Sequence, residues 1–330
     1  MRVLVTGAAG YIGQALLQTL RPWLARRAAG GADVELLLSD VVAVDTAVAA
    51  TPPSSTPAGT EVAIRCVVGD IADPRLQAAL FAAPLDLVFH LAGVVSGAAE
   101  ADFARGKRVN LDATIGLLER CRAQAGANAG VARLVYASSI AVFGVPLPTR
   151  IDDRTEPAPT LSYGSHKRAC ELLIDDYTRR GFVDGRALRL PGVVVRPPLA
   201  NGALSGFNSD LLREPLAGRS YVCPVSRQAT VWLSSKRSVV ANLLRLAELE
   251  PAALGARRAV TAPALAVGID DILAALGRAD PEAPGRVRFE PQPDLEPQFG
   301  RWPRDCDFER ASALGLVTDA SLDALLDTET

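Results

Sequence analysis

The chain has 330 residues and a formal net charge of −2, with an isoelectric point near 5.8. This length accommodates a large domain with a smaller second one, and this charge gives no electrostatic basis for binding nucleic acid or an anionic membrane. No apolar run reaches transmembrane length. The five cysteines are scattered along the chain, which favours reduced thiols. Because the chain has only two histidines, a histidine-based metal site is not expected.

The first segment predicts a strand, a tight turn and a helix in immediate succession. Residues 3–5 are apolar, residues 6–13 contain three glycines, and apolar periodicity runs over residues 15–24. Glycine is needed where a turn is tight and where the backbone approaches a pyrophosphate, and a helix N-terminus favours phosphate. Because Met1 and Arg2 lead directly into this strand, we expect no signal peptide and a cytoplasmic protein. We expect a dinucleotide pyrophosphate to be held by Gly7, Gly10, Tyr11, Ile12 and Gly13.

The next apolar segment, residues 34–39, predicts a second strand that ends in Asp40. A carboxylate at this place accepts hydrogen bonds from two ribose hydroxyls and repels a 2′-phosphate. No arginine follows it, so the sequence favours NAD over NADP. Residues 42–59 are rich in Ala, Pro and Thr, which predicts a surface loop, and a tolerated insertion explains this loop more simply than a functional role.

Three further strands are predicted over residues 62–68, 85–91 and 133–138. His90 lies within the second of these, and a hydrogen-bonded core histidine is the simpler interpretation than a catalyst. Ser139 follows the third strand, at the edge of the sheet where ligands bind in α/β folds.

Tyr163 and Lys167 are four residues apart, so they lie on one face of a helix predicted over residues 163–180. An ammonium near a phenol favours the phenolate, so the pKa of Tyr163 should fall and Tyr163 becomes a usable general base. Ser139 would hold the substrate oxygen, with Ser138 as the competing assignment. This spacing also occurs by chance, and it gains weight from the glycine-rich turn.

The order of these motifs resembles the extended branch of the short-chain dehydrogenase/reductase superfamily over roughly the first 200 residues. The resemblance implies an α/β fold, with a doubly wound parallel Rossmann sheet and a smaller C-terminal α/β substrate lobe. It implies an NAD-binding domain over residues 1–196, completed by about residues 230–250, and a substrate lobe over residues 197–229 and 251–330. The matching positions are Gly7, Gly10, Gly13, Asp40, Gly69, Asp70, Ile71, His90, Leu91, Ala92, Gly93, Ser139, Tyr163 and Lys167.

The resemblance also implies further cofactor contacts. In the family the residue at Asp70 meets the adenine amino group and the backbone at Ile71 meets the ring, although a helix N-cap is an alternative role for Asp70. The family position of the catalytic hydroxyl is Ser139 rather than Ser138. Lys167 grips the nicotinamide ribose, and the remaining contacts to the ribose and the nicotinamide fall to Leu91, Ala92, Gly93, Tyr163, Leu190, Pro191 and Val193.

The later segments contain the candidate substrate ligands. Residues 185–196 predict a buried strand with a Pro-Gly break, and residues 99–123 predict a helix in which Asn110 has a structural hydrogen bond as its alternative to catalysis. Ser96, Asn208 and Arg227 are candidates to hold a polyhydroxylated acid, the arginine pairing with its carboxylate. Ordinary surface polarity is the alternative for each of them. Beyond these, the sequence predicts helices or strands over residues 238–249, 259–267, 270–276, 287–289 and 321–326.

The resemblance favours one reaction and leaves two alternatives. Residues 94–103 and the substrate-lobe segments resemble members of the superfamily that use NAD to oxidise the C2 hydroxyl of a four-carbon sugar acid as homodimers. Ile140 and Ala141 stand where dehydratases carry an acidic pair, which argues against a dehydratase. A sugar-nucleotide 4-epimerase would retain its NAD and need cations such as Arg213, Arg219 and Arg227. A redox-sensing binding protein typically lacks the Tyr or Lys that this chain has.

Overall fold

The computed structural model describes residues 1–27, 33–44, 62–198 and 203–327. The insertion predicted over residues 42–59 lies outside the described residues from position 45 onward. Within the described ranges, no helix combines the length and the apolar character that crossing a membrane requires.

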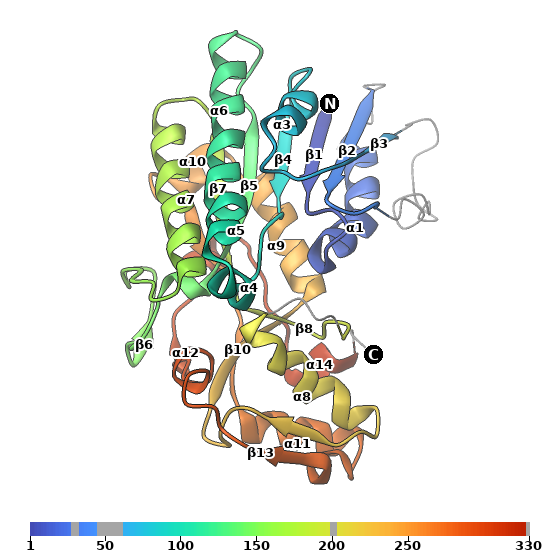
Figure 1. Ribbon diagram of the computed structural model, residues 1–330, viewed down its shortest axis with the longest axis vertical. Helices are drawn as coiled ribbons and strands as arrows, with labels where there is room; N and C mark the ends of the chain where they lie inside the picture. Colours follow the sequence, from blue (N-terminus) through green and yellow to red (C-terminus); the bar gives the residue numbers. More distant parts are fainter. Residues whose placement is uncertain (28–32, 45–61, 199–202, 328–330) are drawn as a thin grey trace.

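A parallel sheet of seven strands is the centre of the larger part of the described chain (Figure 1). Its order is β11-β7-β5-β4-β1-β2-β3, and every neighbouring pair is parallel. This sheet confirms the predicted α/β class and its doubly wound parallel architecture. The strands are β1 (Arg2–Thr6), β2 (Val34–Asp40), β3 (Val62–Val68), β4 (Leu87–His90), β5 (Arg133–Ser139), β7 (Asp184–Leu190) and β11 (Ala259–Thr261).

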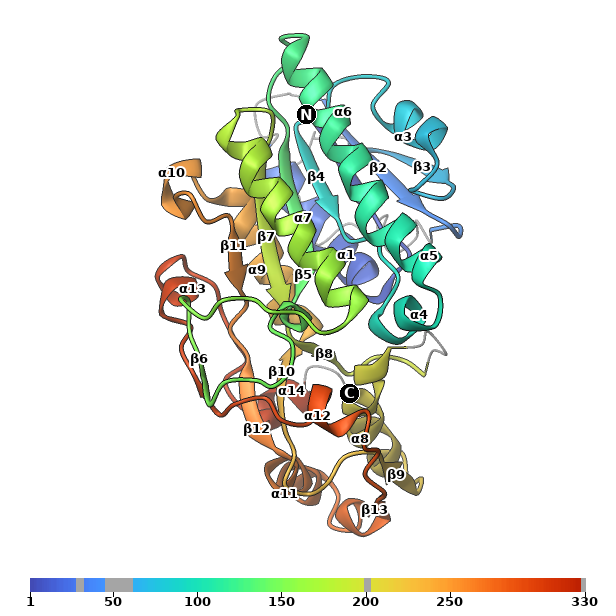
Figure 2. The same ribbon diagram turned by 60° about the vertical axis from the view of Figure 1, so that its left-hand side comes forward.

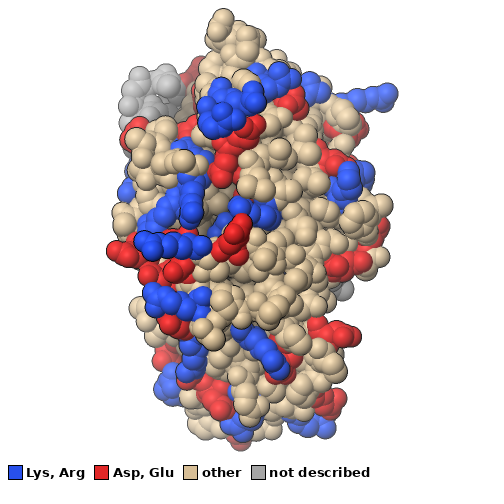
Figure 3. Space-filling view, turned by 90° about the vertical axis from the view of Figure 1, so that its left-hand side faces the viewer, with Lys and Arg blue, Asp and Glu red and all other residues tan. Residues whose placement is uncertain are grey.

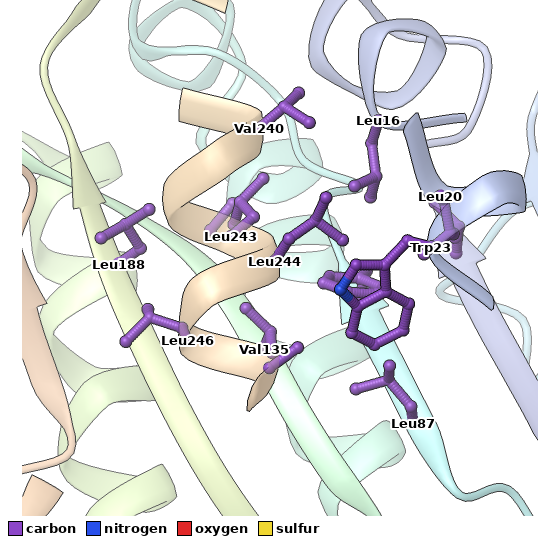
Figure 4. Packing of buried hydrophobic residues seen from close by; sticks show 14 of the residues in the cluster. Leu16, Leu20, Trp23, Leu87, Val135, Leu188, Val240, Leu243, Leu244 and Leu246 are labelled. Atoms are coloured by element: carbon purple, nitrogen blue, oxygen red, sulfur yellow. The ribbon is translucent and has the colours of Figure 1, made fainter. Parts of the chain in front are cut away.

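Helices cover both faces of this sheet. One face packs against α1 (Tyr11–Arg27) and α9 (Lys236–Glu248), and the other against α3 (Pro74–Leu80), α6 (Ala113–Gly126) and α7 (Ser162–Arg179). Figure 4 shows the packing on the first face, where leucines of α9 and Trp23 of α1 lie in one apolar cluster over the strands. Helix α1 begins at Tyr11 rather than at residue 15, so its N-terminus directly follows the glycine-rich turn.

A second, smaller sheet lies beyond the carboxyl ends of these strands (Figure 2). Its order is β12-β10-β8, and it packs with α8, α11 and α14 around a separate apolar cluster. Short strand pairs β9–β13 and β6–β14 complete this part. The bounds are β6 (Arg150–Ile151), β8 (Gly192–Val194), α8 (Phe207–Leu216), β9 (Tyr221–Cys223), β10 (Thr230–Ser235), α10 (Pro251–Leu254), β12 (Leu265–Gly268), α11 (Ile269–Ala279), β13 (Val287–Phe289), α12 (Glu296–Phe299), β14 (Asp305–Cys306), α13 (Glu309–Ala313) and α14 (Leu322–Asp327).

Three segments that were each predicted as one helix or strand are divided into several elements in the structure. Residues 185–196 form β7 and β8, which belong to different sheets because Pro191 cannot continue the ladder, and residues 259–267 are likewise divided between β11 and β12. The helix predicted over residues 99–123 consists of α4 (Ser96–Ala101), α5 (Phe103–Lys107), a π-helical turn and α6. Asp102 interrupts it because its carboxylate accepts a hydrogen bond from Arg105 N and caps α5.

The face that bears α7 and β6 carries Lys and Arg side chains interspersed with Asp and Glu (Figure 3). Beside them lies a broad area without charged side chains. The mixed signs agree with the small net charge of the chain.

Candidate active site

A cavity of about 420 Å³ opens where the carboxyl ends of the parallel strands face the smaller sheet. The glycine-rich turn, the end of β5, the start of α7 and the β7–β8 break all contribute to its wall. The structure brings together most of the predicted site residues here: Gly7, Gly10, Tyr11, Ile12, Gly13, Leu91, Gly93, Ser96, Ser139, Tyr163, Lys167, Leu190, Pro191, Val193 and Asn208 line it. Asp40, Asp70, Ile71, Ala92 and Arg227 do not line it.

The glycine-rich turn has no room for side chains at two of its positions. Gly7 has a φ of +72°, and a Cβ on it would lie 2.6 Å from Ala92 N. A Cβ on Gly13 would lie 2.2 Å from Gly7 O. Asp40 lies beside the turn, because its carboxylate accepts a hydrogen bond from Ala9 N at 2.9 Å. The bare backbone, the start of α1 and this carboxylate fit the pyrophosphate and ribose of a dinucleotide.

Asp70 is not the N-cap of the helix that follows it. That position belongs to Asp73, whose side chain accepts a hydrogen bond from Arg75 N at 2.8 Å. The Asp70 carboxylate accepts hydrogen bonds from Ala72 N at 2.9 Å and from Arg108 Nη1 at 2.5 Å. Burial raises the pKa of Asp70, but these hydrogen bonds and the charges of Arg108 and Arg105 together hold the pKa below its usual value. The structure therefore excludes the N-cap alternative.

Lys167 is buried in the wall of the cavity. Its Nζ donates a hydrogen bond to Ala137 O at 2.6 Å, and lies 4.6 Å from the centre of the Tyr136 ring and 5.7 Å from that of Tyr163. Burial lowers its pKa to about 8. The ammonium therefore lies near the Tyr163 ring and is held by the carbonyl of Ala137, two residues before Ser139.

The prediction that the pKa of Tyr163 falls was wrong, because the effect that raises this pKa is larger than the effects that lower it. Burial raises this pKa above its usual value, and a hydrogen bond from the Ser139 hydroxyl and the charge of Arg196 only partly offset that rise. The Lys167 ammonium is directed to the Ala137 carbonyl rather than to the phenol oxygen. The groups that favour the phenolate here are thus Ser139 and Arg196.

His90 and Asn110 hold the structure together near the cavity. The ring of His90 is buried and contacts a threonine hydroxyl on each side. Its Nδ1 lies 2.7 Å from Thr6 Oγ1, and its Nε2 lies 3.0 Å from Thr114 Oγ1. These contacts confirm the interpretation of His90 as a hydrogen-bonded core histidine. Asn110 exchanges two hydrogen bonds with the main chain of Val94, at 2.8 and 2.9 Å. Its side chain therefore fixes the segment after β4, which confirms the structural alternative.

The smaller sheet and its helices supply amide groups to the cavity. Asn208, on α8, is 5% exposed, and its Oδ1 has no hydrogen-bond partner among the described residues. The same holds for the buried Oε1 of Gln298, on α12. Ser96 is buried, and its hydroxyl accepts a hydrogen bond from Leu204 N at 3.3 Å. Sequence reasoning missed Gln298, because nothing local marks a residue that only the tertiary fold brings to the site.

Arg227 is not at the cavity, and the prediction that it is needs correction. Its guanidinium donates two hydrogen bonds to Asp270 Oδ1, at 2.7 and 2.9 Å, and its side chain is 58% exposed. The arginine that does line the cavity is Arg196, whose Nε donates to Val193 O at 2.9 Å. Within the described ranges no carboxylate pairs with Arg196. The available signal was its place two residues after the end of β8.

The comparisons with known proteins agree with this geometry. Residues 3–213 match the model of the NAD dependent epimerase/dehydratase family. The D-erythronate dehydrogenase of Cupriavidus necator is 43% identical over 330 residues, which cover 99% of this chain and 97% of that protein. The D-erythronate dehydrogenase of Haemophilus influenzae is 35% identical over 322 residues, which cover 97% of this chain and 96% of that protein.

A solved structure described as the nucleoside-diphosphate-sugar epimerase from Agrobacterium tumefaciens is 36% identical, with a TM-score of 0.85 over 99% of this chain and 92% of that chain. The family match covers more than half of the chain, and both relatives align over nearly their full length. The chain therefore belongs to the NAD dependent epimerase/dehydratase family, and it is an oxidoreductase that uses a nicotinamide cofactor.

Proposed function

We propose that this protein oxidises the C2 hydroxyl of D-erythronate to 2-oxo-tetronate, with NAD as the oxidant. The observation that carries the proposal is that Ser139, Tyr163, Lys167 and the cation of Arg196 line a single cavity. The names of the two relatives supply the identity of the sugar acid.

The cofactor site is proposed on the family positions. Gly7, Gly10, Tyr11, Ile12 and Gly13 would hold the pyrophosphate of NAD. Asp40, beside the turn, would bind the adenosine ribose and disfavour a 2′-phosphate. When bound, NAD supplies the carbon that accepts the hydride. The remaining contacts would come from Asp70 and Ile71 at the adenine, from Leu91, Ala92, Gly93, Tyr163 and Lys167 along the ribose and nicotinamide, and from Leu190, Pro191 and Val193 at the ring.

Tyr163 would be the general base. Its phenolate takes the proton of the C2 hydroxyl, while the Ser139 hydroxyl donates a hydrogen bond to the same substrate oxygen. Burial disfavours the phenolate, so the Ser139 hydroxyl and the cation of Arg196 are needed to stabilise it. Ser139 and Lys167 also hold the reacting groups in place, which the short donor–acceptor distance of hydride transfer requires.

Arg196 would bind the substrate carboxylate in place of Arg227. A guanidinium pairs with a carboxylate through two parallel hydrogen bonds, and this pairing is strong where water is excluded. Asn208 Oδ1 and Gln298 Oε1 are buried acceptors without partners among the described residues, which suits donors such as the substrate's hydroxyl groups. Ser96 would complete the set.

The epimerase alternative receives less support from the site. It needs cations for a diphosphate, but Arg213 pairs with Asp210 and Glu214, and Arg219 pairs with Glu214. Arg227 pairs with Asp270, and none of these three arginines lines the cavity. One arginine at the cavity, with no carboxylate partner among the described residues, suits one carboxylate better than two phosphates.

The Tyr163→Phe variant tests the mechanism. It removes the proton acceptor and leaves the ring, so we expect turnover of D-erythronate to fall by about a thousandfold or more while NAD binding stays within about twofold. Initial rates and a calorimetric titration with NAD measure the two effects. Turnover retained in this variant would remove Tyr163 as the base.

A further inference from the structure

Glu171 is a buried carboxylate that the proposed mechanism does not use. It is fully buried on α7, one helical turn after Lys167, and does not line the cavity. Its Oε1 accepts hydrogen bonds from Ser138 Oγ at 2.6 Å and Arg189 Nε at 2.9 Å. Its Oε2 accepts from Arg189 Nη2 at 2.9 Å and Arg168 Nη1 at 3.2 Å. A buried charge persists only when it is paired and hydrogen-bonded in this way.

The partners of Glu171 come from the elements that carry the candidate catalytic groups. Ser138 precedes Ser139 at the end of β5, and Arg189 precedes Leu190 at the end of β7. The two strands pair in register there, with Ser138 opposite Arg189. The carboxylate therefore joins the ends of two adjacent strands to the helix that bears Tyr163 and Lys167.

We propose that Glu171 is a positioning residue, which locks the ends of β5 and β7 to α7 and so holds Ser139 in line with Tyr163 and Lys167. Ser138, whose hydroxyl competed with Ser139 for the catalytic role, has a structural role instead, because it donates the hydrogen bond that links β5 to this carboxylate. The reaction that Glu171 would serve rests on the proposed function, whereas the hydrogen bonds of Glu171 are independent of it.

The charge of Glu171 also acts on Lys167. Burial lowers the pKa of Lys167, and the negative charge of Glu171 opposes this fall. The other titratable groups around the ammonium are Tyr163, His166 and Cys170 of α7, Tyr136 of β5 and His90 of β4. Neutralising Glu171 should therefore lower the pKa of Lys167, so that the ammonium loses its proton at a lower pH.

The first test replaces Ser138 and leaves every charge in place. In Ser138→Ala we expect kcat for D-erythronate to fall about tenfold or more, with the KM for NAD within about twofold, because misplacement of a reacting group affects the chemical step. Ser138→Thr keeps the hydroxyl and should recover most of the rate. The matched control is Ser238→Ala, which removes another buried Ser–carboxylate hydrogen bond, 2.9 Å to Asp319 Oδ1, away from the cavity. Equal kcat in Ser138→Ala and the wild type would overturn the proposal.

The second test does not depend on the substrate. The chain contains only three lysines, Lys107, Lys167 and Lys236, so NMR of protein labelled at lysine Cε resolves their titrations. In Glu171→Gln we expect the Lys167 titration to move to lower pH by about half a unit or more, while Lys107 and Lys236 stay unchanged. An unchanged Lys167 titration would overturn the role of Glu171, whereas wild-type protein inactive on D-erythronate would count only against the proposed function. If Glu171→Gln does not fold, the kcat of Ser138→Ala decides, because that variant keeps every charge and removes one hydrogen bond to the carboxylate.

Discussion

Arg196 is the residue on which the proposed recognition of a sugar acid depends most. It is the arginine that lines the cavity, its positive charge lowers the pKa of Tyr163, and Ser209 Oγ accepts a hydrogen bond from its backbone N at 3.0 Å. One guanidinium would therefore serve both steps, since it attracts the carboxylate and stabilises the phenolate. A neutral polyol would gain only the second effect.

Replacing Arg196 with Gln should weaken both steps. The loss of a charge-assisted hydrogen bond of about 2 kcal/mol corresponds to a roughly thirtyfold fall in kcat/KM for D-erythronate. The pKa of Tyr163 should rise, so the pH at which kcat is half-maximal should move upward. Arg227→Gln is the matched control and should stay within about twofold. A larger loss in Arg227→Gln than in Arg196→Gln would restore Arg227 as the carboxylate ligand.

Local chemistry decided which site residues were predictable. The Tyr163–Lys167 spacing places two side chains on one helix face, and the structure keeps them there. Arg196 lies at the cavity because the chain passes from the large sheet into the smaller one before it. Gln298 lies there because the fold brings the short helix α12 to the cavity from a distant part of the chain. No local sequence pattern predicts either placement. The direction in which the pKa of Tyr163 shifts could not be predicted from the sequence either, because it depends on burial, and burial depends on the whole fold.

At the scale of elements, the strand–turn–helix unit of β1 and α1 determines where the phosphates can lie. The turn is held by one hydrogen bond within it, from Gly10 N to Gly7 O, and by one to β2, from Gly7 N to Ser39 O. The sequence predicted this unit because its steric needs are local. It did not predict that the Pro-Gly break sends the chain into a second sheet, because strand pairing depends on distant residues.

Adding one methyl group to the turn should weaken cofactor binding. In Gly13→Ala the new Cβ would lie 2.2 Å from Gly7 O and 2.7 Å from Ala8 O, so the backbone of the turn must move. We expect the Kd for NAD, measured by calorimetry, to rise by at least about tenfold. Gly126→Ala is the control, because its Cβ would meet no atom within 4 Å. Similar Kd values in the two variants would contradict the placement of the pyrophosphate.

At the scale of the whole molecule, two further features are proposals. We propose that residues 1–196 with the segment near 230–250 act as the NAD-binding domain, and that the rest acts as the substrate lobe. We also propose a homodimer through α6 and α7, in line with the family. Leu172 on α7 is 52% exposed, and Figure 3 shows an area without charged side chains on the face that bears this helix.

The dimer can be tested with one charge. Leu172→Asp should convert a dimer into a monomer in light scattering, because an unpaired carboxylate would be buried in the apolar contact. Val222→Asp places the same charge on an exposed apolar residue of β9 and should leave the mass unchanged. A monomeric wild type, or a dimer that survives Leu172→Asp, would contradict this interface.

The most direct test of the proposed function is the absorbance of NADH when the purified protein meets NAD and a sugar acid. We expect the band to rise with D-erythronate and to stay flat with L-threonate, D-threonate and L-threonine, which are four-carbon acids that differ from D-erythronate in the configuration at C2 or C3 or in the group at C2. The absence of any rise with D-erythronate, in protein that binds NAD, would contradict the assignment and return attention to nucleotide sugars.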